Sequence, residues 1–488
     1  MKFLRADVLA LGLILLLGVA VRLRFLDRPM QYDEAYTYNE YASRPLADGL
    51  SRYTFPNNHL LNTLLVHVSL ALLDDSPRSI RLPAFLAGVL LIPASYRMVA
   101  GLAGRPAGLV AAALVAGSEP LVNYSTNARG YSFVCLATVA LVILARRIRA
   151  TGGRVGDWVG LIVAAALGFY AIPTMLYPFG AVWLWLAAAL RWPGARRPGA
   201  VRLDRLTIAT LSTVGLTAAL YTPVFLGTGL KSVVANPFVV PQPIGRVVAA
   251  LPGSLVEAFR QWNFDVPLAF GGAALVAWLG ALAAARGGPG PDRVRPISAL
   301  FALMLGWSVA VALGQRVVPY PRIWLFALPI YAGCVAAGLM AWIERFGGAD
   351  GKLARSVPGL AGGMCLLLCW AVARGDATLQ ETRELSLDQA AAVARALGAQ
   401  TQPTDAVIAT TPCDATLTYE LIRQHLPTNL LADYRVARAR RLFVVVGHAA
   451  GQSLPEILAA TRTPRAAYAD PALVLDLGGA LVYRLDRR

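Results

Sequence analysis

The sequence predicts a polytopic α-helical membrane protein that ends in a small α/β domain. Composition is the first reason: 57% of the 488 residues are hydrophobic and only 15% are charged, whereas charged residues make up about 25% of a typical soluble domain. The mean hydropathy of +0.55 agrees with this. The second reason is patterning, because the apolar residues fall into long runs that short basic loops separate. A run of roughly 20 apolar residues is long enough to cross the hydrocarbon core of a bilayer.

The net charge of +17 raises the question of a nucleic-acid partner. The arginines, however, cluster in the short loops between apolar runs, and this distribution orients a polytopic protein in its membrane. We therefore expect the positive charge to orient the protein in the lipid bilayer, and we expect no nucleic-acid partner.

The first apolar run, Val8 to Phe25, is expected to be a retained span. It lacks a clean small-residue cleavage site and many apolar runs follow it, which disfavours a cleaved signal peptide. The run Leu60 to Leu73 is short for a span and carries polar Asn62. If it crossed the bilayer, the basic loops 145–154 and 191–205 would face outward, against the positive-inside rule. It is therefore expected to be a juxtamembrane helix.

The long apolar stretch from Trp158 to Leu190 is expected to form two spans. Both of its flanks are basic and must lie inside, so the chain has to turn near Pro173 and Pro178. About eleven spans result, namely Val8–Phe25, Arg81–Val99, Pro106–Val122, Tyr131–Ala145, Trp158–Ile172, Pro173–Leu190, Leu206–Leu226, Val266–Ala285, Pro296–Val317, Ile323–Ile343 and Val357–Ala373.

The same rule predicts the orientation. With the N-terminus inside, we expect a protein of the cytoplasmic (inner) membrane whose active site faces the extracytoplasmic side. The outward segments are then Leu26–Ile80, Asn123–Gly130, Gly227–Asp265, Gln315–Arg322 and everything after Ala373.

The chain changes character near Gly375, so we expect a membrane domain over 1–375 and an extracytoplasmic α/β domain over 376–488. Gly478 and Gly479 lie between two alternating runs, which is a hairpin signal. No glycine-rich nucleotide-binding pattern occurs there. Helices are expected at 387–397, 415–426 and 454–461, and strands at 405–410, 441–448 and on both sides of the glycine pair.

Polar residues of possible chemical use collect in the outward segments. Asp33 and Glu34 stand side by side shortly after the first span, among several tyrosines. Arg129 and Tyr131 lie at the second outward loop, and Arg322 stands at the mouth of the tenth span. For the carboxylates the alternative is solvation of an external loop, and for the arginines it is snorkelling. Two arginines on the outward side oppose the usual loop bias, which favours an anionic ligand.

Four stretches, "YDEAYT", "NNHLLNTLLVHVSLAL", "SIRLPAFLAGVLLIPASYR" and "NYSTNARGYSF", resemble together the N-terminal half of the polyprenyl-phosphate-sugar-dependent GT-C glycosyltransferases. This group is related to protein O-mannosyltransferases and aminoarabinose transferases. The stretch "RIWLFALPIYAGCVAAGL" is similar to a later arginine-containing span of the group. The resemblance covers 8–172 well and the rest loosely, and it implies a GT-C membrane fold.

The resemblance also implies roles for individual residues. The acidic pair of the first outward loop supplies the catalytic carboxylate in this family, here Asp33 with Glu34 as its neighbour. Asn58 and His59 stand where the family usually shows a histidine followed by two prolines. Many members carry a carboxylate where this chain has Asn127, and the five cysteines form no zinc ligand set. No metal site or cofactor is therefore predicted, although a divalent metal stays an open alternative.

The chemistry expected from the residues is transfer of a sugar from a polyprenyl phosphate to an extracytoplasmic acceptor. Such a transfer needs a base for the acceptor hydroxyl and cationic groups for the phosphate. Asp33 would be the base of an inverting displacement, Arg129 and Arg322 would hold the phosphate, and Arg81 and His59 are weaker candidates. Two alternatives stand beside it. A transporter or flippase of lipid-linked sugars would need ionisable residues near mid-span, and a non-catalytic envelope scaffold would leave the carboxylates replaceable.

Overall fold

The computed structural model describes residues 2–191, 201–236, 239–264, 275, 278–279, 291–347, 355–375, 377–431, 436 and 439–488. The chain divides into two compact units. Unit 1 comprises Met1–Phe25, Ser51–Asn62 and Arg81–Gly375, and unit 2 comprises Leu26–Leu50, Thr63–Ile80 and Asp376–Arg488.

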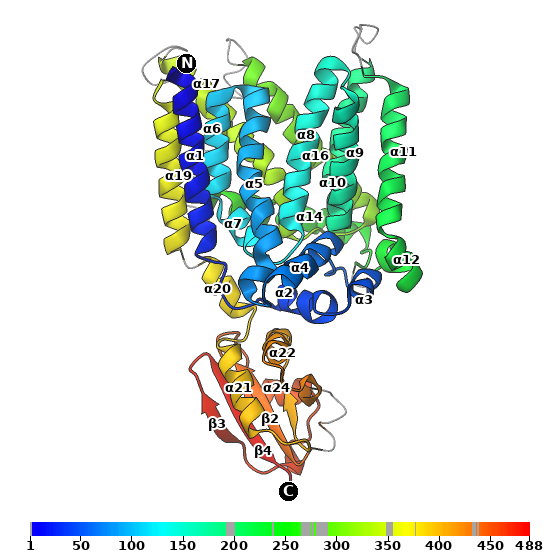
Figure 1. Ribbon diagram of the computed structural model, residues 1–488, viewed down its shortest axis with the longest axis vertical. Helices are drawn as coiled ribbons and strands as arrows, with labels where there is room; N and C mark the ends of the chain where they lie inside the picture. Colours follow the sequence, from blue (N-terminus) through cyan, green and yellow to red (C-terminus); the bar gives the residue numbers. More distant parts are fainter. Residues whose placement is uncertain are drawn as a thin grey trace. The chain divides into compact units, whose positions relative to one another are not determined.

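Unit 1 is a bundle of helices whose long members run side by side (Figure 1). Apolar residues form these helices because a backbone that lies in hydrocarbon has to satisfy its own hydrogen bonds. The helices are α1 (Lys2–Leu23), α5 (Pro77–Ala103), α6 (Arg105–Ala116), α7 (Glu119–Ser125), α8 (Tyr131–Thr151), α9 (Val155–Ala171), α10 (Leu176–Ala188), α11 (Leu203–Leu220), α12 (Thr222–Gly227), α13 (Lys231–Val234), α14 (Ile244–Phe264), α16 (Pro291–Gln315), α17 (Leu328–Gly347) and α19 (Val357–Arg374), with the 3₁₀ segments η2 (Pro173–Met175), η3 (Ala189–Arg191) and η4 (Pro321–Ala327).

Six helical stretches in the described part of the chain are long and apolar enough to cross a membrane. They are Arg5–Leu23, Pro77–Ala103, Tyr131–Thr151, Val294–Gln315, Pro321–Phe346 and Val357–Glu384. The chain is accordingly an integral membrane protein. Helices α6 and α9 are apolar but shorter, and most of the expected span Val266–Ala285 lies outside the described residues.

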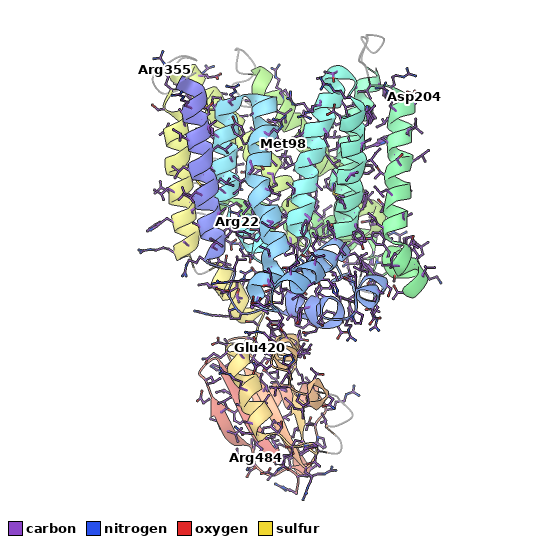
Figure 2. The ribbon with its side chains drawn as sticks, viewed as in Figure 1. Arg22, Met98, Asp204, Arg355, Glu420 and Arg484 are labelled. Atoms are coloured by element: carbon purple, nitrogen blue, oxygen red, sulfur yellow. The ribbon has the colours of Figure 1, made fainter. Side chains whose placement is uncertain are left out.

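The expected span Pro106–Val122 is interrupted in the structure. Helix α6 ends at Ala116, Gly117 and Ser118 break the helix, and α7 begins at Glu119. Arg22 of α1 occupies the break: its guanidinium donates to the carbonyl oxygens of Ala116 at 2.8 Å and Gly18 at 2.9 Å, and to Ser125 Oγ at 2.9 Å. The side chain is fully buried inside the bundle (Figure 2). It satisfies a carbonyl that the end of α6 leaves without a helical partner.

The apolar stretch over 158–190 does form a helical hairpin. Helix α9 ends at Ala171, η2 turns the chain at Pro173, and α10 begins at Leu176. Proline lacks the backbone N–H that would continue a helix, which explains the turn at this position.

Unit 2 joins two segments from the N-terminal half to the C-terminal α/β fold. The sheet has the order β1-β2-β4-β3; β1 and β2 are parallel, and β4 pairs antiparallel with both β2 and β3. The expected hairpin at Gly478 and Gly479 is present, with Gly478 at a positive φ of 76°. The elements are α2 (Tyr32–Thr37), the π-helix η1 (Tyr38–Ala42), α3 (Leu46–Ser51), α4 (Leu60–Leu72), α20 (Ala377–Glu384), α21 (Ala390–Gln400), β1 (Ala406–Ile408), α22 (Cys413–Arg423), η5 (Thr428–Leu431), β2 (Arg441–Gly447), α24 (Leu454–Ala460), η6 (Arg465–Ala467), β3 (Ala472–Asp476) and β4 (Ala480–Asp486).

The sheet buries apolar side chains on both faces. Phe443 and Val445 of β2 lie in the cluster formed with α21 and α22. Leu442 and Val444, which alternate with them, lie in the cluster that includes Ile457 of α24. This alternation is the period-2 arrangement of a strand that helices cover on both sides.

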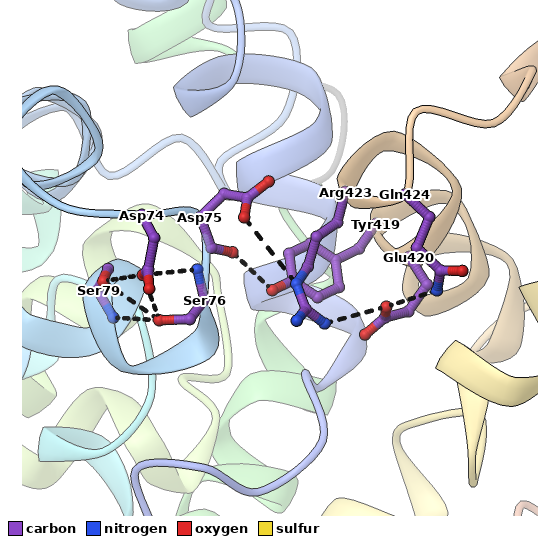
Figure 3. A network of polar contacts seen from close by, with 8 residues as sticks. All are labelled: Asp74, Asp75, Ser76, Ser79, Tyr419, Glu420, Arg423 and Gln424. Carbon is purple, nitrogen blue, oxygen red and sulfur yellow. Dashed lines mark hydrogen bonds and ion pairs between the residues drawn. The ribbon is translucent and has the colours of Figure 1, made fainter.

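Helix α22 packs against the N-terminal segments of unit 2. The Tyr419 hydroxyl donates to the Asp75 carbonyl oxygen at 2.9 Å, and Arg423 lies 3.9 Å from the Asp75 carboxylate (Figure 3). The rings of Tyr38 and Tyr419 meet edge on at 5.2 Å. The C-terminal fold and the segments 26–50 and 63–80 therefore share one packed body.

Candidate active site

Tyr131 is the centre of a cluster of aromatic and cationic side chains in unit 1. Its phenol oxygen accepts a 3.1 Å hydrogen bond from Arg322 Nε, and the Arg129 guanidinium lies 5.4 Å from the centre of its ring. The rings of His59 and Tyr124 meet it edge on, with centroids at 5.5 and 4.9 Å. Four predicted residues and Tyr124 thus form one group, which we call the Tyr131 cluster.

Segments far apart in the sequence contribute to this cluster. His59 directly precedes α4, Arg129 lies in the connection between α7 and α8, and Tyr131 is the first residue of α8. Arg322 lies in η4, directly before α17. The cluster therefore forms where several helices begin or end.

His59 is a neutral hydrogen-bonding group in this cluster. Its Nδ1 accepts a 2.8 Å hydrogen bond from the Gly130 backbone N–H, which leaves the ring proton on Nε2. Burial and, to a smaller extent, the Arg322 guanidinium lower the pKa of His59 to about 3. The close approach requires glycine, because a Cβ at position 130 would lie 3.2 Å from His59 Cβ and 2.9 Å from Ile172 Cγ1.

Arg129 supplies positive charge at a buried position, with only 5% of the residue exposed. Burial lowers the pKa of Arg129 to about 10, an effect that Tyr131 opposes and Arg322 strengthens. The guanidinium therefore stays protonated near neutral pH. Arg322 is half-buried and also lies 4.6 Å from the centre of the Tyr320 ring. Two guanidinium groups in one cluster suit an anion that accepts hydrogen bonds from both.

Hydrogen bonds to the backbone fix the loop that carries Arg129. Asn62 Nδ2 donates to the Ala128 carbonyl oxygen at 2.8 Å, and Ser132 Oγ donates to the Tyr124 carbonyl oxygen at 2.9 Å. Asn62 is buried in the first turn of the largely apolar helix α4. A polar residue in this apolar helix is the sequence signal for the hydrogen bond that fixes the loop. No sequence signal identified Tyr124 as a member of the cluster.

Asn58 and Arg81, two further predicted residues, are both buried. Asn58 Nδ2 donates to the Arg52 carbonyl oxygen at 2.6 Å, so the side chain fixes the loop before α4. Arg81 is fully buried near the start of α5. Binding roles for Asn58 and Arg81 stay predictions.

Helix α14 supports the segment that carries Arg322, and the sequence did not predict it. Trp324 Nε1 donates to Ser254 Oγ at 3.1 Å, and the Tyr331 hydroxyl donates to Asn263 Oδ1 at 2.6 Å. The buried apolar residues of α14 recur at spacings of four, seven and four, which is a helical pattern. They are Val247, Leu251, Ala258 and Trp262.

The acidic pair lies at the start of α2 in unit 2. The Glu34 side chain is fully buried, and its Oε1 accepts a 2.9 Å hydrogen bond from the Gln31 backbone N–H. Glu34 therefore caps its own helix. Asp33 is half-buried, and its carbonyl oxygen accepts a 2.8 Å hydrogen bond from the Thr37 hydroxyl. The two side chains thus differ in exposure.

A search of the described residues finds no group of three or more histidine, cysteine or acidic side chains that could hold a metal ion. The free cysteines Cys135, Cys334, Cys365, Cys369 and Cys413 are all buried.

Comparisons with known proteins agree with this fold. Residues 60–217 match the family model of dolichyl-phosphate-mannose-protein mannosyltransferases, while a comparison with curated protein sequences finds no significant match. The crystal structure of ArnT from Cupriavidus metallidurans bound to undecaprenyl phosphate is similar over 97% of both chains, with a TM-score of 0.60 and 12% sequence identity. An oligosaccharyltransferase of Archaeoglobus fulgidus in complex with Zn and sulfate matches 96% of this chain and 72% of its own, with a TM-score of 0.46 and 11% identity. The family model thus matches about a third of the chain, and the whole chain shares its fold with ArnT.

Proposed function

We propose that this protein transfers a sugar from a polyprenyl-phosphate-linked donor to an extracytoplasmic acceptor. The observation that carries the proposal is the Tyr131 cluster, in which two guanidinium groups and a neutral imidazole gather around one tyrosine. The similar ArnT structure contains undecaprenyl phosphate, which supports a lipid phosphate as the anion.

The cluster would hold the phosphate of the donor. Arg129 and Arg322 present planar donor groups that match phosphate oxygens, and the Nε2–H of His59 is a third donor. Cationic donors at a leaving phosphate stabilise the negative charge that develops when its bond to the sugar breaks. A buried setting strengthens this effect, because less water screens the charges.

Asp33 would act as the general base. Its carboxylate takes the proton of the acceptor hydroxyl, and the acceptor oxygen attacks the anomeric carbon from the face opposite the phosphate. The bond from the anomeric carbon to the phosphate oxygen breaks, and its electron pair leaves with the polyprenyl phosphate. A single displacement of this kind inverts the anomeric centre. Glu34 would orient α2 through its capping hydrogen bond.

The location of the site and of the domains belongs to the same proposal. Membrane domain 1–375 would bind the donor lipid, and 376–488 would contribute to acceptor choice on the outer side of the cytoplasmic membrane. The basic loops between apolar runs support this orientation.

Release of polyprenyl phosphate by the purified protein tests the proposal. A panel of polyprenyl-phosphate sugars is incubated with envelope extract and the native chain, Asp33→Asn or Asp48→Asn. Asp48 is the matched control, since it is a half-buried carboxylate of the same outward segment. We expect release by the native chain and by Asp48→Asn, and a loss of roughly a hundredfold or more in Asp33→Asn, because general-base catalysis contributes about 10²–10⁴-fold.

Donor binding separates the two halves of the proposal. Asp33→Asn should still bind the donor, whereas Arg129→Gln and Arg322→Gln should bind it less tightly. Equal release from the native chain and Asp33→Asn would remove this carboxylate from the chemistry. If no donor gives release but the protein moves a labelled lipid-linked sugar across liposomes, the transporter alternative would replace the transferase.

A further inference from the structure

A basic hollow lies at the other end of unit 1 from the Tyr131 cluster. The ends of α5 and α8 and the start of α6 lie together there (Figure 1), and they enclose about 320 Å³. Arg146 follows Tyr131 by 15 residues on α8, so at 1.5 Å per residue the two sites are roughly 22 Å apart along that helix. The lining residues are Tyr96, Arg97, Ala100, Gly101, Arg105, Ile143, Arg146 and Arg147.

The arginines of this hollow carry more positive charge than the surrounding residues neutralise. Arg147 pairs with Asp157 at 3.3 Å, and Arg105 interacts with Asp7. Arg97 and Arg146 form no ion pair or hydrogen bond within the described part of the chain. All four side chains are exposed. The hollow therefore offers two uncommitted guanidinium groups to an anion.

Two glycines shape the hollow. Gly101 allows Arg146 to lie across the last turn of α5, since a Cβ there would be 2.7 Å from Arg146 Nε. Gly108 keeps α6 close to α5, because a Cβ there would be 2.9 Å from both the Tyr96 carbonyl oxygen and Ala100 Cβ. The close packing of α5 against α6 and α8 fixes the spacing of the arginines.

Exposed leucines of α5 lead along that helix to the hollow. Leu86 and Leu90 are 50% and 56% exposed, and Arg97 follows Leu90 by seven residues, or two helical turns, on the same face. An exposed leucine on a membrane-spanning helix contacts acyl chains. Arg97 thus lies about 10 Å beyond Leu90 along the helix face that the acyl chains would contact. Met98, the next residue, marks this level of the bundle in Figure 2.

We propose that this hollow binds the phosphate headgroup of an anionic membrane lipid, with Arg97 and Arg146 on the phosphate and the acyl chains along Leu86 and Leu90. The volume suits a headgroup, because pockets for whole small molecules range from about 300 to 1,000 Å³. Basic pockets between spanning helices recognise acidic headgroups, and juxtamembrane arginines attract anionic lipids. The site is separate from donor binding and from sugar transfer.

Lipid binding to the full-length, delipidated protein in a neutral detergent tests this proposal. Native mass spectrometry measures binding of phosphatidylglycerol, with phosphatidylcholine and inorganic phosphate as the comparison probes. We expect the double variant Arg97→Gln/Arg146→Gln to bind phosphatidylglycerol roughly tenfold less tightly. Arg154→Gln/Arg205→Gln is the matched control, since it removes the same charge from exposed arginines that do not line the hollow, and this variant should bind as the native chain does.

A second variant distinguishes a lipid from a soluble phosphate. Leu86→Ser/Leu90→Ser should weaken phosphatidylglycerol binding and leave inorganic phosphate unaffected, and thermal unfolding of each variant checks that it folds. Equal affinity for phosphatidylglycerol in the native chain and the Arg97→Gln/Arg146→Gln variant would overturn the proposal. So would inorganic phosphate binding as tightly as the lipid with no effect of the serine substitutions.

Discussion

Tyr131→Phe removes one oxygen atom from the centre of the cluster. That oxygen accepts the hydrogen bond from Arg322 Nε, and a hydrogen bond to a charged group contributes about 1.5–3 kcal/mol. Without it the guanidinium loses the contact that orients it, so we expect binding of the polyprenyl-phosphate donor to weaken by roughly tenfold. Titration of the purified protein with the donor measures this change.

Tyr221→Phe is the control for this prediction, because it removes another buried tyrosine hydroxyl of unit 1, the one that donates to the Phe169 carbonyl oxygen. It should leave donor affinity within about twofold of the native value. Equal donor affinity in Tyr131→Phe and the native chain would show that Arg322 does not need this contact.

His59 predicts a pH dependence of stability. Burial lowers the pKa of His59 from its ordinary value of 6.5 to about 3, so between these pH values the unfolded chain takes up a proton that the folded chain does not. Its contribution to stability is therefore present above pH 6.5 and is lost as the pH falls toward 3. At pH 5 the expected loss relative to pH 7 is roughly 1–2 kcal/mol.

Thermal unfolding in detergent at pH 5 and pH 7 measures this loss. In His59→Gln the group that titrates is absent, so the decrease in melting temperature between the two pH values should be smaller than in the native chain. The same decrease in both proteins would mean that His59 titrates normally in the folded state.

At the residue scale the sequence selected candidate positions, and the catalytic and binding roles of these residues stay predictions. It selected His59, Arg129, Tyr131 and Arg322, which the fold brings together, because polar residues at the ends of apolar runs are few. It paired Glu34 with Asp33 as catalytic candidates, and the fold buries Glu34, whose Oε1 accepts a hydrogen bond from the Gln31 backbone N–H. In the sequence, a carboxylate in the first turn of a helix looks the same whether it caps the helix or takes part in catalysis. Its hydrogen-bond partners are visible only in the structure.

At the scale of elements, Arg22 fixes the break between α6 and α7. Replacing it by methionine leaves the Ala116 carbonyl oxygen and the Ser125 hydroxyl without their donor. A buried polar group that loses its partner costs about 1–3 kcal/mol, so Arg22→Met should destabilise the protein by roughly 2–4 kcal/mol. Chemical or thermal unfolding in detergent measures the change.

Arg24→Met is the comparison for this prediction, since Arg24 is exposed and donates one hydrogen bond, to the Ala373 carbonyl oxygen at 3.2 Å. It should change stability by less than about 0.5 kcal/mol. If Arg22→Met unfolds at the same temperature as the native chain, the break in α6 must be stable without the guanidinium.

The sequence predicted elements well where apolar runs have clear ends. The turn at Pro173 and the hairpin at Gly478 follow from residues whose backbone restricts the choice. It predicted one span over 106–122, where the structure has two helices, because hydropathy does not register Gly117 and Ser118 as a break. It also left out α14, since Pro252 and several polar residues obscure the helical stripe.

At the scale of the whole molecule, unit 2 depends on contacts between distant parts of the chain. Tyr38 and Tyr419 meet edge on at 5.2 Å, and such a pair contributes about 0.5–1.5 kcal/mol beyond buried area. A double-mutant cycle with Tyr38→Leu and Tyr419→Leu should therefore give a coupling energy in that range. Hydrogen exchange of α22 measures the stability of this unit; full additivity of the two substitutions would show that the rings do not interact.

Unit 2 is built from segments that the ribosome synthesises at different times. Residues 26–50 and 63–80 leave the ribosome before their partner α22, which follows about 350 residues later. At roughly 5–20 residues per second, they wait for roughly 18–70 s before α22 exists. During that interval the segment that holds Asp33 lacks its native packing. Helix α22 is thus needed to complete the body that contains this carboxylate, so a chain terminated before α22 would insert its helices without finishing that body.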